Sequence, residues 1–308
     1  MSGIPMGNGS RYYPLILGVG PAKTGSTALF SMLGGHPEIG LADARAAKKG
    51  CCGSESYFFS QRWPLKNYYY EYGRYFSKVQ SSPPTIKYLA EKTPNYHDNP
   101  LTPTRIMQLL HPSNTLLVFT LRDPIDAHIS LFFHRNLGKN LTLPDFFRWS
   151  QLSLLSFDAW KSCIASAWKS LGYPVEPTTM FSDMARISVT DRCSKYYHEG
   201  VAQYRYSETL PYWEKWLPDF PKICVLHSKL ITMCSQVMDG IQTVANLTHH
   251  DLCVEPFAMP SLGINRLLDL NGTDPQRQEL QQYHLHLQKY FESDAQEMNK
   301  FCSRYTIE

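Results

Sequence analysis

The stretch LILGVGPAKTGSTAL, residues 15–29, carries more structural information than any other part of the chain. Its apolar start, residues 15–19, predicts a buried β-strand, and the Gly-Pro pair at 20–21 ends that strand. An apolar-periodic helix is expected from about Thr27 onward. The loop between them offers the N–H groups of a helix start, several hydroxyls and the ammonium of Lys23. Together these groups predict a site for a phosphate or sulfate group.

The loop differs from the Walker A motif of ATP-binding proteins. That motif, G-x-x-x-x-G-K-[ST], places its lysine after the second glycine, whereas here Lys23 precedes Gly25. We therefore expect an anionic, nucleotide-like ligand that is bound in a related but different way. A nucleotide kinase or NTPase is the less favoured class of enzyme, because no strand is followed by an obvious magnesium-binding aspartate.

The chain has the size and composition of a globular enzyme. Its 308 residues, 43% hydrophobic and 13% aromatic, can bury a full core, and we expect one domain over residues 12–308. A net charge of +3 is too small to favour nucleic acid as a partner. Since no apolar run has the length of a membrane span, we expect membrane attachment only through an anchor outside this chain.

Cysteines and glycosylation sequons bear on the compartment. The eight cysteines include no C-x-x-C pair, so we expect no zinc site, and Cys163–Cys193 is the first disulfide to test. Four N-x-[ST] sequons fit the Golgi lumen or another part of the secretory pathway, with the cytoplasm as the alternative. The sequons begin at Asn8, Asn140, Asn246 and Asn271.

Predicted strands and helices alternate along the chain. Beyond the first strand and helix, strands are predicted at 86–90, 115–121 and 223–227, and helices at 103–110, 144–170, 204–217 and 276–302. This alternation is typical of a P-loop-type, three-layer α/β fold with a central parallel sheet flanked by helices. The loop at 20–27, Lys92 and Arg122 each follow a predicted strand. Because such sheets bind ligands at the carboxyl ends of their strands, we expect the three to meet at one edge.

Four motifs occur in a fixed order: GPAKTGST at 20–27, ESYFF at 55–59, AEKTPNY at 90–96 and LRDPIDAHIS at 121–130. Together they resemble the sulfotransferase superfamily that uses 3′-phosphoadenosine 5′-phosphosulfate (PAPS). The second and third motifs are similar to the Golgi heparan sulfate 3-O-sulfotransferase group and related carbohydrate sulfotransferases, and WLPDFP at 216–221 continues the similarity. The resemblance is strong over residues 14–135 and loose over 200–300.

The resemblance implies a role for each residue of the donor site. The 5′-phosphate would be held by four consecutive residues, Thr24, Gly25, Ser26 and Thr27. Lys23 would stabilise the negative charge that grows on the leaving phosphate. Arg122 and Ser130 would hold the 3′-phosphate, which distinguishes this donor from ATP. No metal is implied, because lysines and backbone donors supply the positive field.

Transfer to a hydroxyl also needs a positioned base. By resemblance that base is Glu55, while Lys92 would orient Glu55 or neutralise the transferring sulfonate. The stretch before Glu55 is longer than in the 3-O-sulfotransferase pattern, so residues 42–54 are interpreted as an insertion. Asp43 and Glu38 therefore remain competing candidates for the base.

The sequence thus predicts a PAPS-dependent O-sulfotransferase whose acceptor is a carbohydrate. A small hydroxylated metabolite is an alternative acceptor. A second alternative is a degenerate sulfotransferase-like protein that binds glycans or nucleotide without turnover. The basic C-terminal loop that closes over the donor in the 3-O-sulfotransferase group has only weak counterparts here, Gly263 and Arg266.

Overall fold

The computed structural model describes residues 4–6, 11–43, 55–61, 68–81, 85–99, 101–170, 201, 203–253, 267, 270 and 273–306. Most of the predicted insertion, at 44–54, and the residues Asn8, Cys193, Gly263, Arg266 and Asn271 lie outside these ranges. The described chain divides into two compact units. The first comprises Met1–Arg122, Trp213–Ala258 and Lys300–Glu308, and the second Asp123–Tyr212 and Met259–Asn299. The single domain over 12–308 stays a prediction.

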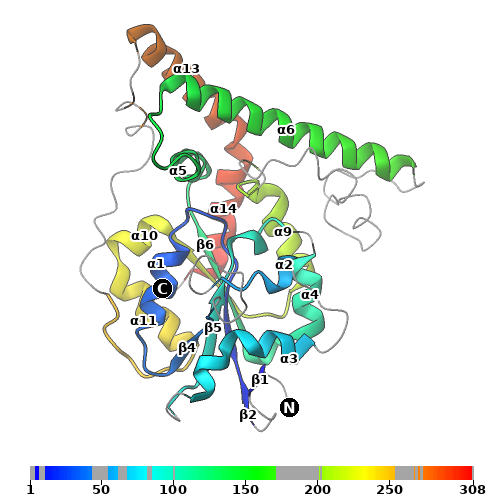
Figure 1. Cartoon of the computed structure of the whole chain (residues 1–308), viewed down its shortest axis with the longest axis vertical. Helices are drawn as coiled ribbons and strands as arrows, with labels where there is room; N and C mark the ends of the chain where they lie inside the picture. Colours follow the sequence, from blue (N-terminus) through cyan, green and yellow to red (C-terminus); the bar gives the residue numbers. More distant parts are fainter. Residues whose placement is uncertain are drawn as a thin grey trace. The chain divides into compact units, whose positions relative to one another are not determined.

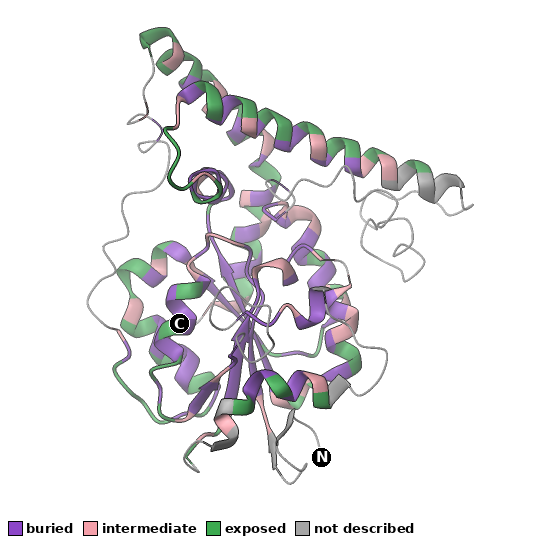
Figure 2. Ribbon diagram, in the orientation of Figure 1, coloured by how far each residue is buried: buried purple, intermediate pink, exposed green. Residues whose placement is uncertain are grey.

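The first unit contains a five-stranded parallel sheet in the order β4-β5-β3-β6-β7 (Figure 1). Its strands are β3 (Leu15–Gly18), β4 (Ile39–Leu41), β5 (Tyr88–Lys92), β6 (Thr115–Leu121) and β7 (Lys222–Leu226). Every residue of β3 and β6 is buried, as expected for strands covered on both faces (Figure 2). The predicted α/β fold with a central parallel sheet is confirmed.

Helices flank this sheet on both sides. Figure 1 shows α1 (Ser26–Leu33), α10 (His227–Thr232) and α11 (Cys234–Val244) on one side, and α2 (Phe58–Gln61), α3 (Tyr68–Gly73) and α4 (Thr102–Leu109) on the other. Short 3-10 helices, η2 (Arg74–Ser81), η3 (Pro94–Tyr96) and η4 (Pro112–Asn114), complete the connections. A separate antiparallel hairpin pairs β1 (Ile4–Met6) with β2 (Arg11–Tyr13).

The second unit is helical. Its helices are α5 (Pro124–Arg135), α6 (Leu143–Ser170), α13 (Asp274–Tyr290) and the amino-terminal parts of α9 (Tyr206–Trp216) and α14 (Glu292–Tyr305). The single helix predicted over 276–302 is wrong, because the structure has two helices that meet at Phe291. The backbone of Phe291 leaves helical values (φ −96°, ψ 8°). Its buried ring lies 6.0 Å from that of His128, so aromatic packing accompanies a break that no proline or glycine marks.

Because all five strands are parallel, their carboxyl ends lie at one edge of the sheet. In the register, Gly18 of β3 pairs with Lys92 of β5, and Leu121 of β6 pairs with Leu226 of β7. The strand order reverses at β3, since β4 and β5 lie on one side of it and β6 and β7 on the other. Parallel α/β sheets bind ligands at such a switch point. As predicted, the loop after β3, Lys92 and Arg122 share one edge of the sheet.

Candidate functional site

The loop between β3 and α1 depends on two glycines. Gly25 has a φ of 90°, a backbone conformation that residues with a side chain rarely adopt. It is also the N-cap of α1, so no capping side chain accepts hydrogen bonds from the N–H groups of the first turn. Helix starts of this kind favour anions. A Cβ on Gly20 would lie 2.0 Å from Oγ1 and 2.3 Å from the carbonyl oxygen of Thr120. The loop can pass this close to β6 only with glycine at position 20.

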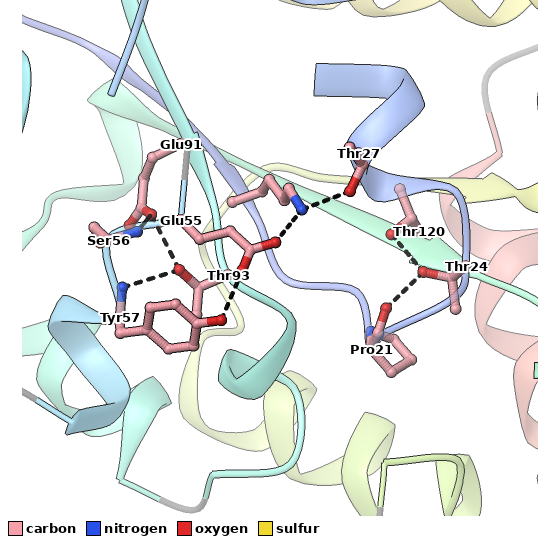
Figure 3. A network of polar contacts seen from close by, with 10 residues as sticks. Pro21, Thr24, Thr27, Glu55, Ser56, Tyr57, Glu91, Thr93 and Thr120 are labelled. Atoms are coloured by element: carbon pink, nitrogen blue, oxygen red, sulfur yellow. Dashed lines mark hydrogen bonds and ion pairs between the residues drawn. The ribbon is translucent and has the colours of Figure 1, made fainter. Parts of the chain in front are cut away.

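The side chain of Thr24 braces the loop from inside. It is fully buried, and its hydroxyl donates a hydrogen bond to the carbonyl of Pro21 at 2.8 Å. Because that uses its one hydrogen, the Thr24 oxygen accepts from the hydroxyl of Thr120 at 2.9 Å (Figure 3). Thr24 would therefore meet a phosphate through its backbone N–H, while its hydroxyl holds the loop on β6.

Arg122 joins the loop from the end of β6. It is buried, and its Nη1 donates to the carbonyl of Lys23 at 3.4 Å. Lys23 itself has a left-handed backbone, with φ 66°. The neighbouring Asp123 carboxylate caps α5 by accepting from the backbone N–H groups of Ile125 and Asp126, each at 3.0 Å. Two cationic side chains thus come from adjoining segments of the predicted donor site.

Glu55 and Lys92 form a buried ion pair at the end of β5, with side chains 8% and 3% exposed. Lys92 Nζ also donates to the hydroxyl of Thr27 at 2.8 Å, which ties the pair to the start of α1 (Figure 3). The second carboxylate oxygen of Glu55 accepts from the hydroxyl of Tyr57 at 2.7 Å. Buried charges need such partners because desolvation is costly. Lys92 thus contacts one carboxylate oxygen of Glu55, while its role in orienting Glu55 for a reaction stays a prediction.

The two competing carboxylates lie at opposite edges of the sheet. Glu38 precedes β4, so it lies at the edge opposite the loop, where it pairs with Lys87 at 2.5 Å and accepts from the N–H of Thr248 at 2.9 Å. These hydrogen bonds, that from Lys87 foremost, lower the pKa of Glu38 to about 2. Asp43 follows the edge strand β4, and its N–H donates to the carbonyl of Tyr75 at 2.7 Å. Of the two, only Asp43 shares the carboxyl edge with Glu55.

Glu91 lies in a fully buried cradle of donors. Its carboxylate accepts from the hydroxyls of Tyr72 (3.0 Å), Tyr96 (2.7 Å) and Thr93 (3.4 Å) and from the N–H of Ser56 (3.4 Å). Burial raises the pKa of Glu91 to about 7 even though these hydrogen bonds favour the charged form. Glu91 and Lys92 are adjacent on β5, so their side chains point to opposite faces of the sheet, and Lys92 pairs with Glu55.

His227 belongs to this edge, although the sequence did not single it out. It follows β7, and its Cδ2 lies 3.0 Å from the position that a Cβ on Gly25 would take. Burial, with a smaller contribution from the charge of Arg122, lowers the pKa of His227 to about 4. A neutral imidazole therefore packs against the 20–27 loop at neutral pH. The only signal in the sequence was its position at the end of the strand predicted at 223–227.

The remaining predicted donor ligands are Ser26 and Ser130. Ser26 begins α1 and is buried. Ser130 lies on α5 in the second unit and is also buried. Its role at a 3′-phosphate stays a prediction, as do the other donor and catalytic roles.

Three further observations concern metals, membranes and disulfides. Among the described residues, no group of three or more His, Cys, Asp or Glu is arranged to hold a metal ion. Within the same part of the chain, no helix combines the length and the hydrophobicity needed to cross a bilayer. Disulfides join Cys224 to Cys302 and Cys234 to Cys253. Cys163 is also disulfide-bonded.

Comparison with known proteins shows a shared fold. No family model matches the sequence. The crystal structure of a sulfotransferase from Alicyclobacillus acidocaldarius superposes with a TM-score of 0.54, covering 95% of this chain and 97% of that one at 15% identity. The sulfotransferase domain from the curacin biosynthetic pathway gives 0.39 at 14% identity, covering 84% and 83% of the two chains. That from the Synechococcus PCC 7002 olefin synthase gives 0.38 at 11% identity, covering 90% of each. The first likeness shows a common fold, and the other two are too weak to carry an argument.

Proposed function

We propose that this protein is a sulfotransferase that moves a sulfuryl group from PAPS to an acceptor hydroxyl, with a carbohydrate as the acceptor. The observation that carries the proposal is the convergence of an anion loop, Arg122 and the Glu55–Lys92 pair at one sheet edge. The fold shared with a sulfotransferase supports it. The position of Lys23 ahead of Gly25 argues against an ATP-binding loop of the Walker type.

The donor half of the site is cationic and rich in backbone donors. The start of α1, Lys23 and Arg122 would hold the phosphates of PAPS. In the transfer, the S–O bond to the 5′-phosphate breaks and negative charge grows on that phosphate. Lys23 and the loop N–H groups would stabilise this charge, which is the main electrostatic contribution to such transfers.

The acceptor half would centre on Glu55. The acceptor oxygen forms the new bond to sulfur, and its proton passes to a carboxylate oxygen of Glu55. Both oxygens of Glu55 already have partners, Lys92 on one and the Tyr57 hydroxyl on the other. An acceptor hydroxyl would therefore replace or share the Tyr57 contact. Lys92, held between Glu55 and Thr27, is suited to neutralise the transferring sulfonate.

The proposal is tested by two measurements on the same variants. Calorimetry follows binding of the product 3′-phosphoadenosine 5′-phosphate (PAP), and labelled PAPS follows transfer to a panel of glycans and small hydroxylated compounds. Lys23→Ala should abolish transfer and weaken PAP binding, whereas Glu55→Gln should keep PAP binding and lose transfer. Glu38→Gln, at the opposite edge, is the matched control and should keep both. A wild-type protein that neither binds PAP nor transfers sulfate would contradict the proposal.

The engaged state of Glu55 also favours a second candidate, a sulfotransferase-like protein that binds its ligand without turnover. A base whose two oxygens are both hydrogen-bonded has less capacity for an acceptor proton. Tight PAP binding without transfer to any member of the panel would support this candidate. Transfer to small compounds alone would instead identify a metabolite sulfotransferase.

We propose the Golgi lumen or another part of the secretory pathway as its location. Disulfides form and persist in oxidising compartments, and two of them lie within the first unit. The sequon residues Asn140 and Asn246 are exposed, so both are accessible to glycosylation. A shift in electrophoretic mobility after glycosidase treatment of protein expressed in animal cells would support this location, and unmodified protein with free thiols would contradict it.

A further inference from the structure

We propose that Glu91 is a positioning residue that holds the 55–57 turn, and with it Glu55, in the geometry needed for transfer. The inference rests on the proposed function, since it concerns the base of that reaction. Glu91 is fully buried and acts on Glu55 only through the intervening turn. It is therefore a positioning group and not a catalytic one.

Four successive backbone N–H groups, those of residues 56–59, lead to this one carboxylate. Ser56 N–H donates to Glu91 directly at 3.4 Å. Tyr57 N–H donates at 3.1 Å to the hydroxyl of Thr93, which donates at 3.4 Å to Glu91 (Figure 3). The N–H groups of Phe58 and Phe59 connect to Glu91 through the Tyr96 hydroxyl, which donates to Glu91 at 2.7 Å. Phe59 N–H donates to the Tyr96 hydroxyl at 3.4 Å. Phe58 N–H donates at 3.2 Å to the Ser56 hydroxyl, which in turn donates to the Tyr96 hydroxyl at 2.8 Å.

The turn needs such anchoring because its backbone is strained. Tyr57 has a φ of 54°, a left-handed conformation that costs a residue with a side chain about 1–2 kcal/mol. This conformation allows the Tyr57 hydroxyl to donate a hydrogen bond to the Glu55 carboxylate at 2.7 Å. Removing the anchors would let the backbone relax toward negative φ. Tyr57 and Glu55 would then lose their mutual orientation.

Glu91 and Lys92 act on the same turn from the two faces of β5. Lys92 pairs with the Glu55 side chain on one face, and Glu91 receives the backbone of the turn on the other. Lys92 alone would fix one carboxylate oxygen of Glu55 but would not fix the backbone conformation of the 55–57 turn. The two contacts are therefore complementary, and loss of Glu91 should misplace the base without removing its ion pair.

The ionisation of Glu91 supplies a readout that a purely structural residue would not give. The titratable groups facing it are Tyr72 from α3 and Tyr96 from η3, and both are neutral near pH 7 because burial raises their pKa further. With the pKa of Glu91 raised to about 7, its carboxylate forms near neutrality. The transfer rate should rise as this acceptor becomes charged, while PAP affinity should not follow the same ionisation.

The test compares Glu91→Gln with Tyr72→Phe, which removes a hydroxyl that donates to Glu91 but keeps the ring that packs against Phe58 and Phe59. Amide hydrogen exchange at 56–59 and at the 20–27 loop, PAP affinity and kcat are measured on each. Glu91→Gln should speed exchange at 56–59 alone, keep PAP affinity within about threefold, lower kcat about 10- to 100-fold and remove the rise of kcat near pH 7. Tyr72→Phe should change kcat less than about threefold.

A second pair of variants keeps the test decisive if Glu91→Gln folds poorly. Thr93→Val removes the hydroxyl relay between Tyr57 and Glu91, whereas Thr93→Ser keeps it. Unchanged exchange at 56–59 and unchanged kcat in Glu91→Gln and Thr93→Val would overturn the inference. So would equal losses of kcat and PAP affinity, which indicate general unfolding. If the wild type transfers no sulfate, the proposed function fails, yet the exchange measurements still decide whether Glu91 holds the turn.

Discussion

The donor loop and the 55–57 turn lie at the same sheet edge but are built in different ways. The loop takes its shape chiefly from its own residues, Gly20, Gly25 and the Thr24 hydroxyl, with hydrogen bonds to the neighbouring strands β6 and β5. The turn takes its shape from β5, whose side chains hold it over sequence separations of 35 to 37 residues. The loop is thus specified locally, and the turn by tertiary contacts.

This difference has a mechanical consequence. A loop built from glycines and backbone donors tolerates changes around it, provided that its own residues are kept. A turn held by buried charge depends on every member of its network, because a buried charge without its partner costs several kcal/mol. Distant substitutions should therefore damage the turn more than the loop, which depends chiefly on its own residues.

The largest effect is expected from Lys92→Met. It leaves Glu55 buried without its cation, so the free energy of unfolding should fall by about 3–5 kcal/mol and transfer should be lost. The double variant Lys92→Met/Glu55→Gln should regain part of that stability, because the uncompensated charge is gone. Urea unfolding measures both.

The control for this prediction is Lys87→Met. Lys87 is 52% exposed in its pair with Glu38, so its loss should cost at most about 1 kcal/mol. Equal losses in the free energy of unfolding for Lys92→Met and Lys87→Met would mean that burial of the Glu55–Lys92 pair does not matter. The 55–57 turn would then not depend on buried charge in the way argued above.

Gly20→Ala should damage the loop from within. The new Cβ would meet Oγ1 and the backbone carbonyl of Thr120, at 2.0 and 2.3 Å, and backbone cannot move aside cheaply. We expect a loss of about 3 kcal/mol and weaker PAP binding. Gly138→Ala, whose Cβ meets nothing within 4 Å and is strained only by a φ of 80°, should cost about 1 kcal/mol. A Gly20 variant with wild-type stability and PAP affinity would show that this close approach is not needed.

Acid should loosen the segment that leads into the loop, through His97. Burial lowers the pKa of His97 to about 3, against an opposing hydrogen bond to the Val19 backbone. The folded state thus favours the neutral ring, so its contribution to stability is complete above pH 6.5 and is lost as pH falls toward 3. Between pH 6.5 and 5 the loss is about 2 kcal/mol. Urea unfolding at several pH values should give a shallower dependence in His97→Asn; an identical slope would exclude His97 as the cause.

The smallest effect is expected at Thr24, where the hydroxyl is structural. Thr24→Val removes the contacts with Pro21 and Thr120 and should cost about 1–2 kcal/mol of stability. Thr24→Ser keeps the hydroxyl and should cost less. PAP affinity should change less than stability in both, because the ligand would meet the backbone. A large loss of PAP affinity in the valine variant, at wild-type stability, would instead place this hydroxyl on the ligand.

The elements that the sequence predicted well are those whose environment is uniform. Every residue of the strand at 115–121 is buried, so its uninterrupted apolar run predicts a buried strand with the correct bounds. The strand predicted at 86–90 lies two residues later, at Tyr88–Lys92, because its last two positions are the charged residues Glu91 and Lys92. Strand β4, Ile39–Leu41, was missed because three residues show no period.

The candidate site divides in the same way. Lys23 and the glycines could be recognised because their chemistry is contiguous in sequence. Glu91 and Lys92 are adjacent in sequence, and only the pleat of β5 shows that their side chains point to opposite faces of the sheet. His227 could not be recognised because a lone histidine carries no pattern, and its closeness to Gly25 is a tertiary fact.

The pairing of β5 with β3 also bears on how faithfully the sheet assembles. A slip of β5 by one residue would exchange the faces of Glu91 and Lys92. The Lys92 ammonium would then lie among the buried hydroxyls of Tyr72 and Tyr96, and the Glu91 carboxylate would leave them. In the native register, the absence of a side chain on Gly18 is what admits Lys92, since a Cβ there would lie 2.5 Å from that of Lys92. A misaligned pairing would therefore bury charge without a partner, so the charges at this strand end favour the native register over a slipped one.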